Sequence, residues 1–224
     1  MNTEVIHVYF MPGMAANPKI FENIELPSDK FESHWLEWEI PFKNESLTNY
    51  AKRLSKKVTH DNVVLLGVSF GGILVQEMQK YVHARKVIIV STVKTKYELP
   101  KRLKFAKYIK VYKLIPARAF KDLDFLARFA LGKRATKRVE LYKKYLSVND
   151  AHYMRWSIQQ IVCWNVKTPL KDVIHIHGDK DLVFPYYHIK NCITVKGGTH
   201  IMILNRYKWF NEHLPKLILS ENKL

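Results

Sequence analysis

A short run of apolar β-formers, Val63–Leu66, most constrains what this chain can fold into. A strand with no polar face is typical of a parallel sheet that is covered on both sides. From Ile73 to Val82 the apolar residues recur at helical spacing, which predicts a helix. Ser69 therefore lies in a very short strand-to-helix connection, with Gly67 and Gly71 two residues away on either side. Because glycine has no Cβ, so sharp a turn can form there and present the serine hydroxyl at the carboxyl end of the sheet.

The rest of the chain alternates between strand and helix patterns. Further strands are predicted at 4–10, 34–40, 86–91, 172–177 and 192–195, and further helices at 46–58, 150–164 and 201–219. Strands that alternate with helices in this way predict an α/β architecture with a parallel sheet.

The pentapeptide Gly67-Val68-Ser69-Phe70-Gly71 matches the G-x-S-x-G nucleophile elbow, and through it the chain resembles the α/β-hydrolase family. The resemblance implies the α/β-hydrolase fold, with a mostly parallel central sheet flanked by helices and a helical cap insertion. It divides the chain into a core, residues 1–92 and 154–224, and a cap, residues 93–153. The core resembles a minimal version that starts at the strand before the oxyanion loop.

A serine nucleophile needs a base to take its proton and an acid to orient that base. His200 follows the strand at 192–195, and two aspartates, Asp179 and Asp181, follow the strand at 172–177. These strand ends lie on the edge where sites form in open α/β sheets. The order Ser, Asp, His is that of the family. Resemblance to the family pattern favours Asp181 as the acid, while Asp179, otherwise a turn residue, stays open as the alternative.

The resemblance also implies an oxyanion hole in the loop after the first strand, residues 11–16. The backbone N–H groups of Met14 and Phe70 would be its two donors. This chain has Pro12-Gly13 where the family usually has His-Gly. Because the donor is a backbone group, the difference leaves it available.

Histidines elsewhere in the chain suggest little metal chemistry. His175, His177 and Asp179 match the start of a binuclear metal motif, H-x-H-x-D, but Lys180 stands where the next histidine is expected. We interpret His175 and His177 as locally hydrogen-bonded residues at a strand end. Four further histidines are interpreted as isolated and either solvated or structural: His7, His60, His83 and His152. We therefore expect no metal and no organic cofactor.

One segment holds most of the formal net charge of +17. Residues 94–144 contain 17 Lys and Arg and four acidic residues. Three amphipathic helices are predicted in this region, at 101–114, 117–131 and 133–146. Three interpretations are open: a solvated face, a surface for peripheral contact with anionic membranes, or an electropositive mouth that attracts an anionic substrate such as a CoA thioester. No nucleic-acid-binding module is recognised, so no specific nucleic acid partner is expected.

These features predict a serine hydrolase that cleaves a small carboxylic ester or thioester through Ser69, His200 and Asp181, with an acyl-enzyme intermediate. The alternatives are a non-catalytic ligand-binding protein on the same fold, or an acyltransferase or C–C bond hydrolase that uses the same residues. Two cysteines without metal or redox spacing, and an amino-terminal segment without a signal-peptide pattern, predict a cytoplasmic protein. The sequence contains no feature that indicates an oligomeric state.

Overall fold

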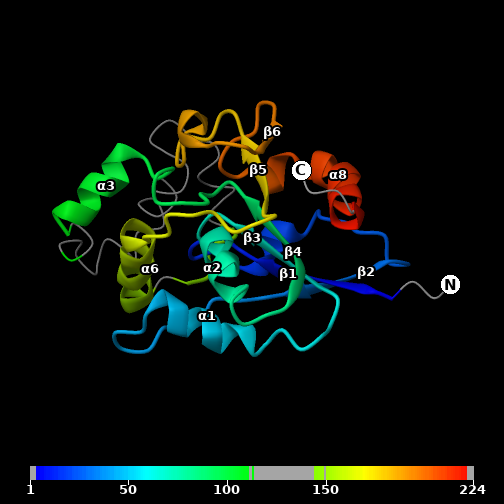
Figure 1. Ribbon diagram of the computed structural model, residues 1–224, viewed down its shortest axis with the longest axis horizontal. Helices are drawn as coiled ribbons and strands as arrows, with labels where there is room; N and C mark the ends of the chain where they lie inside the picture. The colour runs from blue at the N-terminus through cyan, green and yellow to red at the C-terminus, as the bar shows by residue number, and fades with distance from the viewer. Residues whose placement is uncertain (1–3, 111–112, 114–143, 149, 221–224) are drawn as a thin grey trace.

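The computed structural model describes residues 4–110, 113, 144–148 and 150–220. Within them, six strands form one parallel sheet in the order β2-β1-β3-β4-β5-β6 (Figure 1). The strands are β1 (Ile6–Met11), β2 (Phe31–Trp35), β3 (Val63–Val68), β4 (Ala84–Val90), β5 (Ile174–Gly178) and β6 (Ile193–Val195). The parallel α/β architecture predicted from the sequence is confirmed.

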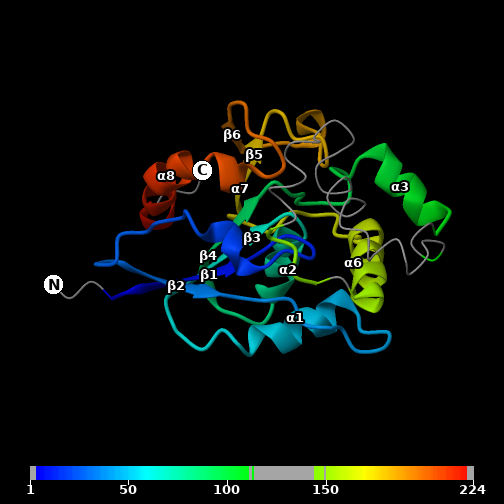
Figure 2. The ribbon, with the colours of Figure 1, turned by 180° about the vertical axis from the view of Figure 1, so that it is seen from behind.

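Helices cover both faces of the sheet (Figures 1 and 2). One face packs against α1 (Leu47–Ser55), α2 (Phe70–Met78) and α6 (Ala151–Cys163), and the other against η1 (Pro18–Phe21), α7 (Met202–Asn205) and α8 (Tyr207–Leu219). Neighbouring residues of a strand point to opposite faces: Tyr9 belongs to the α1 side and Val8 to the α8 side. This double burial explains why β3 is apolar at every position outside Gly67.

Two helices begin where the sequence predicts, because a side chain caps each first turn. The hydroxyl of Ser46 accepts the N–H of Asn49 at 3.1 Å before α1. The carboxylate of Asp150 accepts the N–H of Tyr153 at 2.8 Å before α6. Both bonds satisfy N–H groups that the helix itself leaves without partners.

The predicted strand at 34–40 is wrong in its bounds. The observed strand, β2, spans Phe31–Trp35 and lies at the edge of the sheet, paired with β1 alone. After it, Leu36 and Trp38 are buried in the core without belonging to a strand. Their alternating pattern therefore reflects burial of a loop rather than sheet pairing.

The predicted continuous helix at 201–219 is two helices, α7 and α8, separated at Arg206. The backbone of Arg206 leaves helical geometry at φ −122° and ψ 21°. Its guanidinium donates to the carbonyl of Gly197 at 3.3 Å. Both helices bury apolar residues against the same face, so the hydrophobic period continues across the break.

Only part of the predicted cap lies within the described residues. Its first helix, α3 (Lys101–Tyr108), is shorter than the predicted 101–114 and buries only Leu103. The apolar stripe predicted on it faces solvent: Phe105 is 62% exposed and Tyr108 85%. The predicted helix at 117–131 and most of that at 133–146 lie outside the described residues. At the end of the predicted helix 133–146, residues 144–145 form a turn and Leu146 forms a single antiparallel β-bridge with Ala16.

None of the described helices combines the length and the apolar character that a membrane span requires.

Candidate active site

Ser69 occupies a strained position between β3 and α2. Its φ of 54° and ψ of −120° lie where non-glycine residues are rare. A Cβ added to Gly67 would lie 2.3 Å from the carbonyl oxygen of Gly71, and one added to Gly71 would lie 2.4 Å from that of Pro12. Only glycine fits at both positions, so these contacts keep the turn sharp and hold it against the loop after β1.

Two loops at the same edge of the sheet supply the other candidate residues. Asp181 follows β5, and His200 follows β6. A Cβ on Gly178 would lie 2.2 Å from the carbonyl oxygen of Gly198, so the two backbones touch. The N–H of Lys180 also donates to that carbonyl at 2.8 Å. The two loops are therefore fixed side by side.

His200 makes contact with both other candidate residues. Its Nε2 lies 2.9 Å from Oγ of Ser69, and its Nδ1 lies 2.9 Å from Oδ2 of Asp181. Next to an ionised Asp181, the imidazole proton belongs on Nδ1, so Nε2 is free to accept the proton of Ser69. The Phe184 ring packs against the imidazole in a T-shaped arrangement, with the ring centres 5.6 Å apart.

Asp181 is held by a compact set of hydrogen bonds. The residue is 3% exposed, and its Oδ1 accepts the backbone N–H groups of Val183 at 2.7 Å and Phe184 at 3.0 Å. His177 is also close, with Nε2 3.5 Å from Oδ2 of Asp181. Burial lowers the pKa of His177, so the ring is neutral and donates from Nε2 to the carbonyl of Phe184 at 2.8 Å. The interpretation of His177 as locally hydrogen-bonded is confirmed, whereas neither ring nitrogen of the buried His175 is in hydrogen-bond geometry with a partner among the described residues.

The alternative acid, Asp179, is directed elsewhere. Its Oδ1 accepts the N–H of Gly197 at 2.7 Å, which is the role of a turn residue. Of the two aspartates, the structure brings Asp181 and not Asp179 to His200.

The loop that contains Met14 is held on either side of that residue. Trp38 donates from its indole nitrogen to the carbonyl of Gly13 at 2.8 Å, and the N–H of Ala15 donates to the hydroxyl of Tyr153 at 3.1 Å. Phe70 is the first residue of α2, a position whose N–H has no partner within a helix.

Trp38 and Tyr153 were not identified from the sequence. The indole of Trp38 also stacks on the ring of Phe70, with centres 4.8 Å apart and planes 5° apart. One residue lies in a loop after β2 and the other in α6, and no motif links either of them to the loop after β1. Only the packed structure reveals that they support it.

A small cavity lies beside Ser69. Its volume is about 20 Å³, room for about one water molecule. Most of its walls are apolar, and the lining residues are Gly13, Ile20, Val68, Ser69, His200, Ile201, Ile203 and Leu204. Gly13 therefore borders the same space as Ser69 and His200.

The first helix of the predicted cap contacts the Asp181 loop directly. The guanidinium of Arg102 in α3 donates to the carbonyls of Leu182 and Val183, both at 2.8 Å. At least one of the many basic residues of 94–144 therefore supports the loop that carries the candidate acid.

The interpretation of His7 and His60 as isolated is wrong. The structure brings both together with His34 at the β2 edge of the sheet, several strands away from His175 and His177 on β5. Among the described residues, this is where three ligand-type side chains lie close enough to share an ion.

Comparison with known proteins extends the fold assignment. No protein-family model matches the sequence, and no curated protein sequence does. Solved structures match over nearly the whole chain. A hydrolase from Pseudomonas aeruginosa PA01 has a TM-score of 0.69 at 13% identity, covering 96% of this chain and 91% of that one.

Two further structures match to a similar extent. A thermophilic esterase from Thermogutta terrifontis has a TM-score of 0.69 at 14% identity, over 96% of this chain and 92% of its own. The enol-lactonase from Burkholderia xenovorans LB400 has a TM-score of 0.66 at 12% identity, over 97% and 92%. With the parallel sheet and the sharp turn at Ser69, these similarities establish the α/β-hydrolase fold.

Proposed function

We propose that this chain, with its α/β-hydrolase fold, is a serine hydrolase that cleaves a carboxylic ester or thioester. The observation that carries the proposal is the position of His200, whose two ring nitrogens each lie 2.9 Å from a partner, Ser69 on one side and Asp181 on the other. A nucleophile, a base and a buried acid in contact are what acyl transfer to serine requires.

In the proposed mechanism, His200 takes the hydroxyl proton as Oγ of Ser69 attacks the substrate carbonyl carbon. Asp181 stabilises the imidazolium that forms, and the N–H groups of Met14 and Phe70 stabilise the oxyanion. Collapse of the tetrahedral intermediate expels the alcohol or thiol, which receives the proton from His200, and leaves an acyl group on Ser69. A water molecule, deprotonated by His200, then releases the acid and restores Ser69. These steps need no metal and no organic cofactor.

The basic segment 94–144 suggests the kind of substrate. A positive field near the site would attract an anionic substrate such as an acyl-CoA, and salt would weaken that attraction. The same positive charge could instead bind the surface of an anionic membrane. The position of Arg102 favours attraction of an anionic substrate, because its guanidinium lies against the loop of Asp181.

The test measures turnover of p-nitrophenyl esters and acyl-CoAs of increasing chain length, at low and high salt. Ser69→Ala is compared with Ser28→Ala, a change at an exposed loop serine. We expect turnover by the wild type and Ser28→Ala and a loss of about 10⁴-fold or more in Ser69→Ala. Equal turnover by Ser69→Ala would overturn the mechanism.

Labelling with a serine-directed phosphonate separates the remaining outcomes. Labelling of Ser69 without turnover indicates a competent nucleophile whose substrate lies outside the panel. Absence of both labelling and turnover favours a binding protein on the same fold. Product analysis with added alcohol or amine acceptors distinguishes hydrolysis from acyl transfer, and diketone substrates test C–C cleavage.

A further inference from the structure

A patch of polar side chains lies on the α1 side of the sheet, at the amino-terminal part of β1 and β2. β1 contributes His7 and Tyr9, and β2 contributes Glu32 and His34. The parallel register pairs His7 with Glu32 and Tyr9 with His34, so all four side chains share one face. His60, from the connection between α1 and β3, completes the group.

The three imidazoles are in mutual contact. Nδ1 of His7 lies 2.9 Å from Nε2 of His34. The ring of His60 stacks on that of His7 at 3.9 Å and on that of His34 at 4.5 Å. One nitrogen from each ring falls within 4.8 Å of the other two.

We propose that this group is a site for a divalent transition metal ion, with Zn²⁺ as the reference occupant, bound by His7, His34, His60 and Glu32. Two nitrogens on one tetrahedral Zn²⁺ lie about 3.3 Å apart, given Zn–N bonds of about 2.05 Å. The separation of 2.9 Å between Nδ1 of His7 and Nε2 of His34 is close to this. The nitrogen of His60 lies within 4.8 Å of both, and rotation of its exposed side chain out of the stack would bring it to the same ion.

Glu32 fits the fourth position. Its Oε2 lies 3.6 Å from Nδ1 of His7, and its Oε1 lies 3.7 Å from Nε2 of His34. Its side chain is 58% exposed and free to adjust. Three imidazoles and one carboxylate favour Zn²⁺, Ni²⁺ or Cu²⁺ over Mg²⁺ and Ca²⁺, which prefer oxygen ligands.

A buried tyrosine orients one of the proposed ligands. The hydroxyl of Tyr9 lies 2.6 Å from Nδ1 of His60 and also accepts the N–H of Thr59 at 3.2 Å. Metal-binding histidines commonly have such a partner on the ring nitrogen that does not bind the ion.

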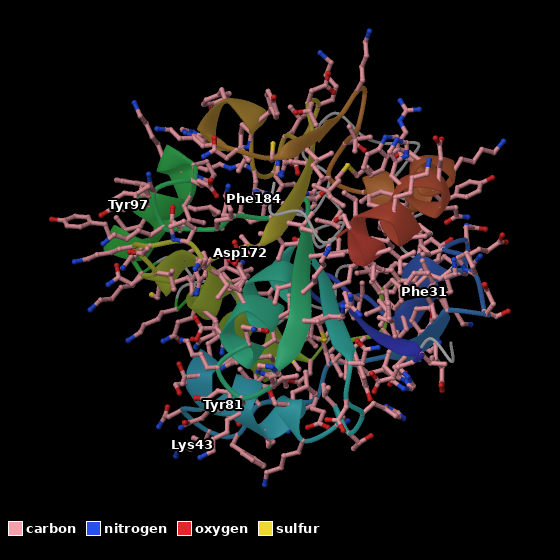
Figure 3. All side chains as sticks on the ribbon, turned by 45° about the vertical axis from the view of Figure 1, so that its right-hand side comes forward. Phe31, Lys43, Tyr81, Tyr97, Asp172 and Phe184 are labelled. Carbon is pink, nitrogen blue, oxygen red and sulfur yellow. The ribbon has the colours of Figure 1, made fainter. Side chains whose placement is uncertain are left out.

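The position of the group indicates a structural ion that is separate from the proposed hydrolase site. The candidate catalytic residues lie at the carboxyl ends of the strands, and His7 is roughly 13 Å along β1 from Met11 at about 3.3 Å per residue. Figure 3 shows Phe31, at the start of β2, away from Phe184 of the Asp181 loop and across the molecule from Tyr97. An ion here would join the edge strand β2 to β1 and to the connection before β3.

The experiment uses the full chain without a polyhistidine tag, stripped with a chelator and dialysed. Zn²⁺ binding is followed by calorimetry, and Co²⁺ binding by its visible absorption, which reports tetrahedral geometry. We expect one ion per chain, and a loss of affinity of at least about 100-fold in His34→Gln and His60→Gln. Tyr9→Phe, which removes the partner of His60, is expected to weaken binding by about 10-fold.

The matched control is His83→Gln, which changes an exposed histidine outside the group and should bind Zn²⁺ as the wild type does. Zn²⁺ should raise the Tm of the wild type and of His83→Gln but not that of His60→Gln. Failure of the wild type to bind Zn²⁺ and Co²⁺ at millimolar concentration, or undiminished binding by His60→Gln, would overturn the proposal. If His34→Gln fails to fold, His60→Gln decides the matter alone, because His60 is exposed on a loop.

Discussion

Nδ1 of His200 lies 2.9 Å from Oδ2 of Asp181, whereas Asp179, two residues earlier in the same loop, bonds the N–H of Gly197. The two carboxylates thus have different partners, although both follow β5. Asp181 can orient the imidazole, and Asp179 can shape the turn. The two roles can be separated by the same substitution at each position.

We expect Asp181→Asn to lower kcat by about 10⁴-fold and Asp179→Asn to lower it by less than about 10-fold. Asparagine keeps an oxygen that can accept the N–H groups of Val183 and Phe184, but it no longer stabilises the imidazolium of His200. Ester turnover is measured for both variants, with circular dichroism to check the fold. Losses of similar size would contradict the assignment of Asp181 as the acid.

The strained backbone at Ser69 predicts an effect on stability. Ser69→Gly should be more stable than Ser69→Ala by about 1 kcal/mol, because glycine adopts a φ of 54° without a Cβ clash. Both variants lack the hydroxyl and should be inactive. Urea denaturation gives the two free energies of unfolding. An alanine variant as stable as the glycine variant would mean that this turn stores no strain.

Tyr153→Phe should destabilise the protein by about 1–3 kcal/mol, because the buried N–H of Ala15 loses its acceptor. The same change loosens the loop that contains Met14, so kcat should fall more than KM rises. The matched control is Tyr97→Phe, since Tyr97 is exposed. Unchanged stability and kcat in Tyr153→Phe would show that this hydrogen bond does not hold the loop.

Stability should decrease as the pH falls below about 6.5. Burial holds the pKa of His175 well below its usual 6.5, and the nearby His177 and Lys94 act in the same direction. The folded chain keeps His175 neutral while the unfolded chain protonates it below pH 6.5. The free energy of unfolding therefore falls with decreasing pH, by at most about 1.4 kcal/mol per pH unit for each such histidine.

Urea denaturation of the wild type and of His175→Leu between pH 7.5 and pH 5 measures this contribution. The variant should show a shallower loss of stability. The pKa values of His177 and His34 are also lowered, so part of the pH dependence of the free energy of unfolding should remain in both proteins. If the free energies of unfolding of the two proteins fell in parallel with decreasing pH, the loss of stability could not be assigned to His175.

Local features of the sequence were enough to predict much of the fold. The strand, turn and helix around Ser69 depend on neighbouring residues, and the glycines that allow the turn lie within two positions of it. The parallel sheet follows from the alternation of strands and helices. The bounds of β2 and the break at Arg206 were not predicted, because in both places apolar residues keep their period while the backbone changes direction.

The sequence by itself determined the strand, turn and helix around Ser69 and the two loops that could supply an acid and a base, because periodicity and glycine spacing act between near neighbours. Tertiary structure alone decided which aspartate meets His200, since the contact between Gly178 and Gly198 sets how those loops lie together. It also joined His7, His34 and His60. No spacing in the sequence links these three, because only strand register and the return of the chain before β3 bring them into contact.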